Sequence, residues 1–61
     1  MPFVTIEMYE GRTLDQRRAL AKNVTNAIVD ALKVAPEAVE IKIVDLKKEN
    51  VARGGTLAVD R

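Results

Sequence analysis

The first ten residues alternate between apolar and polar side chains, which is the pattern of a β-strand with one buried face. One face carries Val4, Ile6 and Met8, and the other carries Thr5, Glu7 and Tyr9. Because the alternation holds from the third residue to the tenth, it predicts a strand over residues 3–10.

A longer spacing of apolar residues follows and predicts a helix over residues 14–33. These residues recur at intervals of three and four and form one stripe: Leu20, Val24, Ala27, Ile28, Ala31 and Leu32. The charged side chains, Arg17 among them, fall mainly off this stripe. Thr13 and Gln16 have the spacing of a capping box, in which each side chain bonds to the other residue's backbone N–H. We expect the helix to begin at this box and to end before Pro36.

Alternation returns over residues 39–46 and predicts a second strand, with Val39, Ile41 and Ile43 facing inward. A strand, a helix and a second strand of these lengths make a βαβ unit, whose two strands lie parallel. In the tail, Gly54–Gly55 has the composition of a two-residue hairpin turn. The prediction is one domain, residues 1–61, of the α/β (α+β) class: a single βαβ unit with parallel strands and a short C-terminal hairpin.

The predicted unit leaves much of its apolar surface uncovered. One helix covers one face of a two-stranded sheet, whereas parallel sheets are normally buried on both faces. The face opposite the helix carries Thr5, Tyr9 and Val44. For a chain of 61 residues, burial of apolar surface stabilises the folded state by about 85–90 kcal/mol, and the loss of conformational entropy costs about 90 kcal/mol. The chain has no cysteine and therefore no disulfide to add to this balance, so we expect it to assemble with other copies.

Composition narrows the chemistry that the chain can perform. It has no Cys, His, Ser or Trp, which excludes Cys or His metal sites, a serine or cysteine nucleophile, and a histidine base. Ten Lys/Arg against nine Asp/Glu give a net charge of +1, so no nucleic-acid partner is expected. Residues 1–10 lack a basic region, and no stretch approaches the ~18 apolar residues of a membrane span. We expect a cytoplasmic protein without a signal peptide or membrane association.

Three short motifs at particular positions give the chain a resemblance to a known family. They are Met1-Pro2 at the start, Glu10-Gly11-Arg12-Thr13 after the first strand, and Gly54–Gly55 near the end. With this spacing and length, the chain resembles the 4-oxalocrotonate tautomerase family of the tautomerase superfamily. The similarity covers nearly the whole chain without a gap. It implies a homohexamer built as a trimer of dimers, sites formed between chains, a small-molecule carboxylate substrate, and no metal or organic cofactor.

The resemblance also implies a mechanism in which Met1 is removed and Pro2 is the catalytic base and acid. A proline nitrogen is a basic secondary amine only when no residue precedes it, and joined to Met1 it is an amide. An apolar pocket and nearby arginines lower the pKa of such an ammonium group by desolvation and like charge. The pKa then lies closer to the pH at which a general base works best. The implied reaction is enol–keto tautomerisation of a small carboxylated 2-hydroxydienoate or 2-keto acid.

Four further positions correspond to positions in the family's site. Arg12 matches the arginine that contacts the substrate carboxylate, which a guanidinium binds through two parallel hydrogen bonds while it stabilises charge on the dienolate. Val51 replaces a pocket phenylalanine and would form an apolar wall. Arg53 is a candidate for a second positive charge at the site. Glu40 stands where better-known members carry a second substrate-binding arginine, and would repel the far end of a dicarboxylate.

Other hypotheses stay open at this point. Taken singly, Arg12 is typical of a solvated loop and Pro2 of the start of an edge strand. Glu40, and any retention of Met1, favour a subunit that keeps the fold without turnover, in a homo- or hetero-oligomer. A small dimeric DNA-binding protein also begins with a strand, but residues 39–46 alternate as a strand where such a protein needs a second helix.

Overall fold

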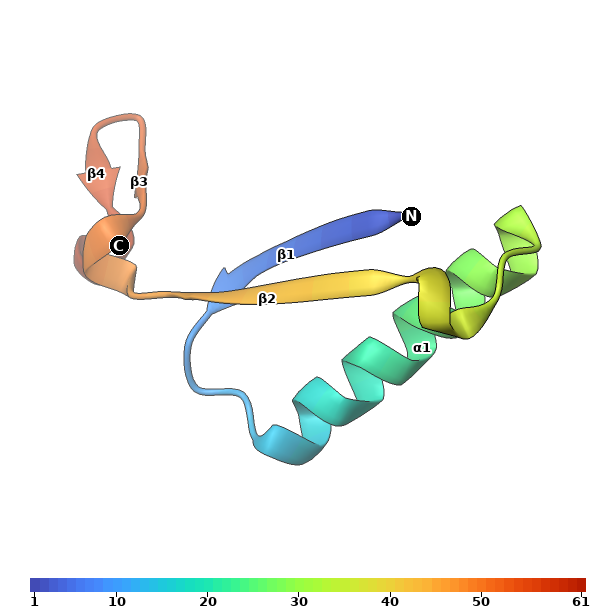
Figure 1. Ribbon diagram of the computed structural model, residues 1–61. Helices are drawn as coiled ribbons and strands as arrows, with labels where there is room; N and C mark the ends of the chain where they lie inside the picture. The colour runs from blue at the N-terminus through green and yellow to red at the C-terminus, as the bar shows by residue number, and fades with distance from the viewer.

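The computed structural model describes residues 1–61 and shows a helix lying across one face of a parallel pair of strands (Figure 1). The elements are β1 (Phe3–Tyr9), α1 (Leu14–Leu32) and β2 (Glu40–Leu46). The two strands are in register from Phe3↔Glu40 to Tyr9↔Leu46, and they are parallel. The predicted βαβ unit is therefore confirmed. The backbone N–H of Glu10 still donates to the carbonyl of Leu46 at 3.0 Å, one residue beyond the end of β1.

The tail forms the predicted hairpin, which pairs β3 (Ala52–Arg53) with β4 (Thr56–Leu57) in antiparallel fashion. Gly54 and Gly55 have φ values of 58° and 84°, and a tight two-residue turn of this kind requires positive φ at both central positions. Short 3-10 turns flank the hairpin at Lys48–Asn50 and Ala58–Asp60. The hairpin projects from the end of the strands farthest from the N-terminus (Figure 1).

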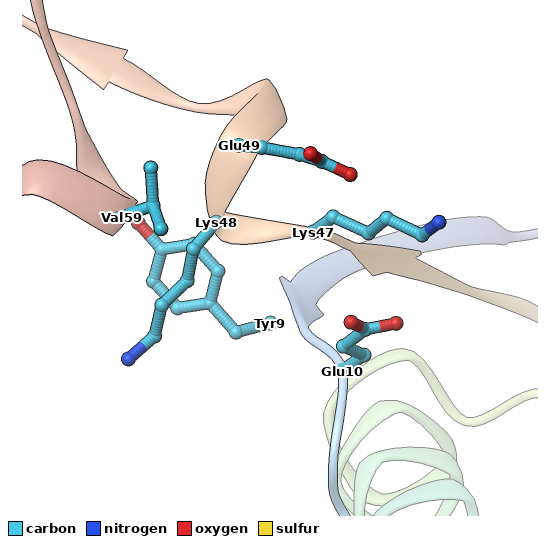
Figure 2. Close-up of a pocket in the computed structure, with 6 residues that line it drawn as sticks. All are labelled: Tyr9, Glu10, Lys47, Lys48, Glu49 and Val59. Atoms are coloured by element: carbon cyan, nitrogen blue, oxygen red, sulfur yellow. The ribbon is translucent and has the colours of Figure 1, made fainter.

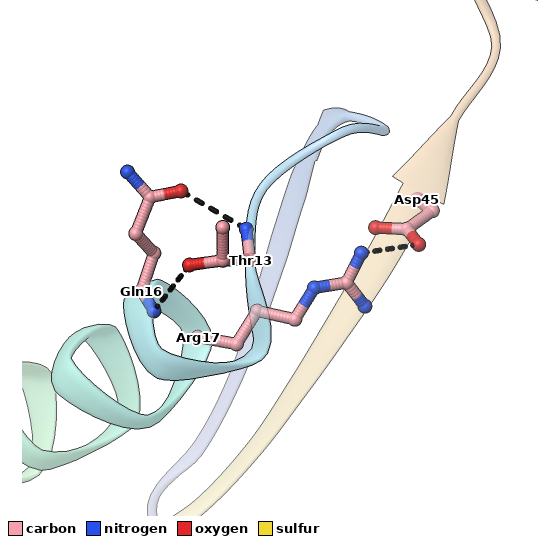
Figure 3. Close-up of polar contacts among 4 residues, drawn as sticks. All are labelled: Thr13, Gln16, Arg17 and Asp45. Atoms are coloured by element: carbon pink, nitrogen blue, oxygen red, sulfur yellow. Dashed lines mark hydrogen bonds and ion pairs between the residues drawn. The ribbon is translucent and has the colours of Figure 1, made fainter.

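The capping box at the start of α1 is present as predicted (Figure 3). The backbone N–H of Gln16 donates to the Thr13 hydroxyl at 3.1 Å, and the backbone N–H of Thr13 donates to the Gln16 side-chain carbonyl at 3.0 Å. Two N–H groups of the first turn thereby gain partners that the helix itself does not supply. The helix ends at Leu32 because Lys33 adopts the left-handed conformation, with φ of 56°.

The face of α1 that turns inward differs in part from the predicted stripe. The half-buried residues of the helix are Arg17, Leu20, Ala21, Val24, Thr25, Ile28 and Val29. Leu20, Val24 and Ile28 confirm the prediction, whereas Ala27, Ala31 and Leu32 are exposed. Ala27 lies on the flank of the inward stripe, whereas Ala31 and Leu32 belong to the last turn of α1, which extends past the ends of the strands (Figure 1).

Arg17 contradicts the expectation that it lies off the buried stripe. Its side chain is 31% exposed and donates to the Asp45 carboxylate of β2 at 2.6 Å (Figure 3). A hydrophobic pattern counts arginine as polar, but its long apolar stem packs along the inward face while its charged end reaches a partner. This ion pair joins the first turns of α1 to the far end of β2.

The chain by itself encloses no core. None of its residues is fully buried, and 4824 Å² of surface is exposed, against about 3,900 Å² for a compact monomer of this mass. Its radius of gyration is 14.6 Å, where a compact domain of this length has about 10.5 Å. The large exposed apolar side chains are Met1, Phe3, Tyr9, Leu14, Leu32, Leu57 and Val59. No helix combines the length and apolar character needed to cross a membrane.

Candidate functional site

Arg12 stands where the chain leaves β1 and turns toward the helix. Gly11 has φ of 112°, a conformation that side-chain-bearing residues rarely adopt, and this turn takes Arg12 out of the line of the strand. The Arg12 side chain lines a cavity of about 390 Å³ at the end of the sheet. Its other lining residues are Glu7, Met8, Tyr9, Leu46 and Val51. We call this cavity the Arg12 pocket.

Three residues of the Arg12 pocket, Glu7, Tyr9 and Leu46, lie on the sheet face turned away from α1, whereas Met8 belongs to the alternate set of β1 positions. Glu7 and Tyr9 belong to the exposed set of β1 positions, while the alternate positions turn toward the helix. In the neighbouring strand, Leu46 is the register partner of Tyr9. Val51 follows the turn after β2 and is half-buried. The pocket thus combines one cation, one carboxylate and four residues with largely apolar side chains.

The Arg12 guanidinium has no partner within its own chain, which sets it apart from most of the other arginines. Arg17 and Arg18 form ion pairs with Asp45 and Asp15, and Arg61 donates to the Tyr9 hydroxyl at 3.4 Å. Arg12 and Arg53 take part in no such contact. A guanidinium that lacks an internal partner and borders apolar surface can bind a carboxylate through two parallel hydrogen bonds. Arg53 lies on the hairpin and lines neither cavity of the chain.

Pro2 lies at the opposite end of β1 from Arg12. It is half-buried, and its carbonyl accepts the backbone N–H of Glu40 at 3.0 Å. The Met1 ammonium donates to the carbonyl of Ala38 at 2.8 Å. A seven-residue strand measures roughly 20 Å between its first and last residues. The structure therefore brings Arg12 together with Val51, but it does not bring Pro2 to either of them within one chain.

Glu40 begins β2 beside Pro2. It is the register partner of Phe3 and is exposed. A carboxylate at this end of the sheet would meet any group that approaches the proline from the open face. Like Arg12, Glu40 forms no ion pair within the chain.

A second cavity, of about 350 Å³, shares Tyr9 with the Arg12 pocket (Figure 2). Figure 2 shows Tyr9 and Glu10 from the end of β1 beside the residues that follow β2. The full lining is Tyr9, Glu10, Lys47, Lys48, Glu49 and Val59. Two lysines are balanced by two glutamates, so this cavity has no net charge with which to attract an anion. It contains none of the predicted site residues.

The family resemblance suggested Arg12 and Val51 as site residues but did not place Glu7, Met8, Tyr9 or Leu46 beside them. The alternation of β1 already put Glu7 and Tyr9 on the face away from the helix, and that was the available signal. The alternation does not show the direction that the chain takes after Gly11. That direction brings Arg12 beside Glu7 and Tyr9.

The fold is a βαβ unit, and a pocket at the end of its sheet holds an unpartnered arginine beside one carboxylate and four residues with largely apolar side chains. The chain matches the model of the family described as Tautomerase enzyme over residues 2–61. It is 40% identical over 60 residues to a protein named Probable tautomerase from Listeria monocytogenes serotype 4b (strain F2365), a match that covers 98% of each chain. The chain belongs to the tautomerase family of enzymes.

Solved structures agree with this assignment. A 4-oxalocrotonate tautomerase isozyme from Methylibium petroleiphilum is 41% identical to the chain, with a TM-score of 0.89 over 97% of this chain and 95% of the other. A heterohexamer 4-oxalocrotonate tautomerase from Chloroflexus aurantiacus J-10-fl is 27% identical, with a TM-score of 0.91 over 98% of this chain and 97% of the other. The βαβ unit with its terminal hairpin is thus the fold of 4-oxalocrotonate tautomerases.

Proposed function

We propose that the protein is an enol–keto tautomerase acting on a small carboxylated 2-hydroxydienoate or 2-keto acid. Removal of Met1 makes Pro2 the first residue and gives it a free secondary amine. Its nitrogen takes the proton of the substrate's enol hydroxyl and returns a proton to a carbon of the conjugated system. The C–O bond becomes a carbonyl as the carbon–carbon double bond shifts, so no electrons leave or enter the substrate.

Arg12 binds the substrate carboxylate in this proposal. The observation that supports this role most strongly is that its guanidinium is unpartnered beside an apolar cavity, whereas Arg17, Arg18 and Arg61 are all engaged. A cation held at that position also stabilises the negative charge that grows on the dienolate. Val51 forms an apolar wall of the pocket, and Arg53 is a second cation that another copy can present.

The site forms between copies of the chain, because one chain holds Pro2 and Arg12 at opposite ends of β1. We propose a homohexamer arranged as a trimer of dimers, in which the N-terminus of one copy reaches the Arg12 pocket of another. Two observations support assembly: the chain has no fully buried residue, and a tautomerase with a TM-score of 0.91 to it is a heterohexamer.

The test starts with intact mass spectrometry, to establish that Pro2 is the first residue of the purified protein. Ultraviolet absorbance then follows the conversion of phenylenolpyruvate and of 2-hydroxymuconate. We expect turnover by the wild-type protein and a loss of about a hundredfold or more in Pro2→Ala, because general-base catalysis contributes 10²–10⁴-fold. The Pro2→Ala variant must keep the wild-type assembly in sedimentation. Equal rates for the two proteins would contradict the proposed role of Pro2.

A subunit that keeps the fold without turnover is the second candidate. Glu40 favours it, because a carboxylate next to Pro2 in the sheet attracts an ammonium group and opposes loss of its proton. Absence of turnover in protein whose Pro2 is verified as free would support this candidate over the enzyme.

A further inference from the structure

The Arg12 pocket contains one positive and one negative side chain, which does not suit a substrate with two carboxylates. Arg12 is the one cation among the lining residues, and Glu7 contributes a carboxylate to the same cavity. Neither side chain has an ion-pair partner within the chain. Among the residues that one chain supplies to this cavity, a substrate carboxylate that binds Arg12 leaves no second cation for another carboxylate, because Arg53 lines neither cavity of its own chain. A second acid in the cavity would instead face Glu7.

The remainder of the pocket suits an apolar group. Its other lining residues are Met8, Tyr9, Leu46 and Val51. Tyr9 offers a ring against which a planar apolar group can pack. The Tyr9 hydroxyl is engaged by Arg61 at 3.4 Å.

We infer that the substrate of the Arg12 pocket carries a single carboxylate and an apolar or aromatic remainder, and that Glu7 is the residue that excludes a second carboxylate. This inference rests on the proposed function and names its substrate class. For an arylenolpyruvate, the enol O–H proton leaves to the Pro2 nitrogen and a proton is added to the ring-bearing carbon, which gives the 2-keto acid. Atoms and charge balance without a co-reactant.

The first measurement compares kcat/KM for phenylenolpyruvate, a monoacid, and 2-hydroxymuconate, a diacid. We expect the wild-type protein to favour the monoacid by about tenfold or more, the ratio that one like-charge contact of ~1.4 kcal/mol produces. Glu7→Gln keeps the shape of the side chain and removes its charge. This substitution should raise kcat/KM for the diacid about tenfold, mainly by lowering KM. The kcat/KM for the monoacid should change less than about twofold.

Two matched variants locate the effect. Glu49→Gln, which lines the other cavity, should leave the ratio of the two substrates unchanged. If Glu40→Gln raises kcat/KM for the diacid and Glu7→Gln does not, the assignment to Glu7 is wrong. A wild-type protein that favours 2-hydroxymuconate, or a Glu7→Gln variant that changes both substrates equally, would also overturn the assignment.

Calorimetric binding separates this inference from the proposed function. The probes are 3-phenylpropanoate and adipate, a monoacid and a diacid that have no enol to convert. We expect the wild-type protein to bind 3-phenylpropanoate about tenfold more tightly than adipate. Arg12→Ala should abolish binding of both probes. Glu7→Gln should reduce the difference in affinity between them. This binding preference without any turnover would support the inference and contradict the proposed function. Equal affinity for the two probes would overturn the inference even in an active enzyme.

Discussion

At the scale of single residues, the arginines differ in whether the fold already uses them. Arg17 and Arg18 form ion pairs with aspartates of the same chain, whereas the Arg12 guanidinium has no ion-pair partner within the chain and Arg12 lines the Arg12 pocket. Exposed pairs such as Arg18–Asp15 contribute little to stability, so under the proposed function the free guanidinium of Arg12 bears mainly on ligand binding.

Replacing Arg12 by Ala should therefore leave the fold intact and remove catalysis. We expect kcat/KM for an enol substrate to fall by about 10²–10³-fold, the usual effect of removing one preorganised donor to a developing negative charge. Arg18→Ala is the matched control, because it removes an exposed arginine paired only with Asp15, and its activity should stay within about twofold. A similar loss in both variants would show that positive charge acts generally and not at this site.

Arg12 and Val51 were named from their positions in the family resemblance, and the structure places them in one pocket. Glu7 and Tyr9 were predictable as a face of the strand but not as part of the pocket. That step needs the backbone direction after Gly11, which a pattern of side chains along the chain does not contain. The resemblance named Pro2 as the base, but within one chain Pro2 lies at the opposite end of β1 from Arg12, so in the proposed assembly the residues that it faces come from another copy.

At the scale of elements, the start of α1 holds most of the specific polar contacts. The Thr13–Gln16 capping box begins the helix, and one residue later Arg17 ties it to Asp45 of β2 (Figure 3). Local sequence signals predicted the box because its two partners are three residues apart. The same signals missed the ion pair because its partners are 28 residues apart and meet only through the βαβ crossover.

Thr13→Ala should lower the free energy of unfolding by about 1 kcal/mol, the typical cost of losing an N-cap side chain. Thr56→Ala is the matched control, because Thr56 is exposed in β4 and its side chain makes no hydrogen bond in the chain. Chemical denaturation at one fixed protein concentration measures both. If the two substitutions cost the same, the capping box does not stabilise the helix.

The Arg17–Asp45 pair should show a measurable coupling energy. With side chains 31% and 38% exposed, it is less solvated than the Arg18–Asp15 pair at 67% and 90%. A double-mutant cycle with alanine at Arg17 and Asp45 should give about 0.5–1 kcal/mol, against about 0.3 kcal/mol for the exposed pair. The reverse order of the two couplings would contradict the view that this pair positions the helix on the sheet.

At the scale of the whole molecule, the chain is an open layer. We predicted assembly from the topology, since one helix cannot cover two faces of a sheet. The structure agrees in that large apolar side chains are exposed in the single chain. The sequence did not reveal which faces meet, because the apolar positions of the open sheet face are interrupted by charged ones, Glu7 and Lys42 among them.

The melting temperature should therefore rise with protein concentration, because folding of such a chain is coupled to association. Phe3→Asp, which places a charge at a side chain that is 65% exposed on the open sheet face, should dissociate the assembly in sedimentation. Asn23→Asp adds the same charge on the exposed side of α1 and should leave the assembly intact. A melting temperature that is independent of concentration would mean that the single chain is stable alone.

The most direct measurement mixes two inactive variants, Pro2→Ala and Arg12→Ala, after dissociation and joint refolding. When two different copies supply the two residues, random mixing in equal amounts makes about a quarter of the sites native. We predict recovery of about a quarter of wild-type activity, with no recovery when the separately refolded variants are combined without exchange. If jointly refolded variants stay as inactive as their parents, then Pro2 and Arg12 do not form one site between copies of the chain.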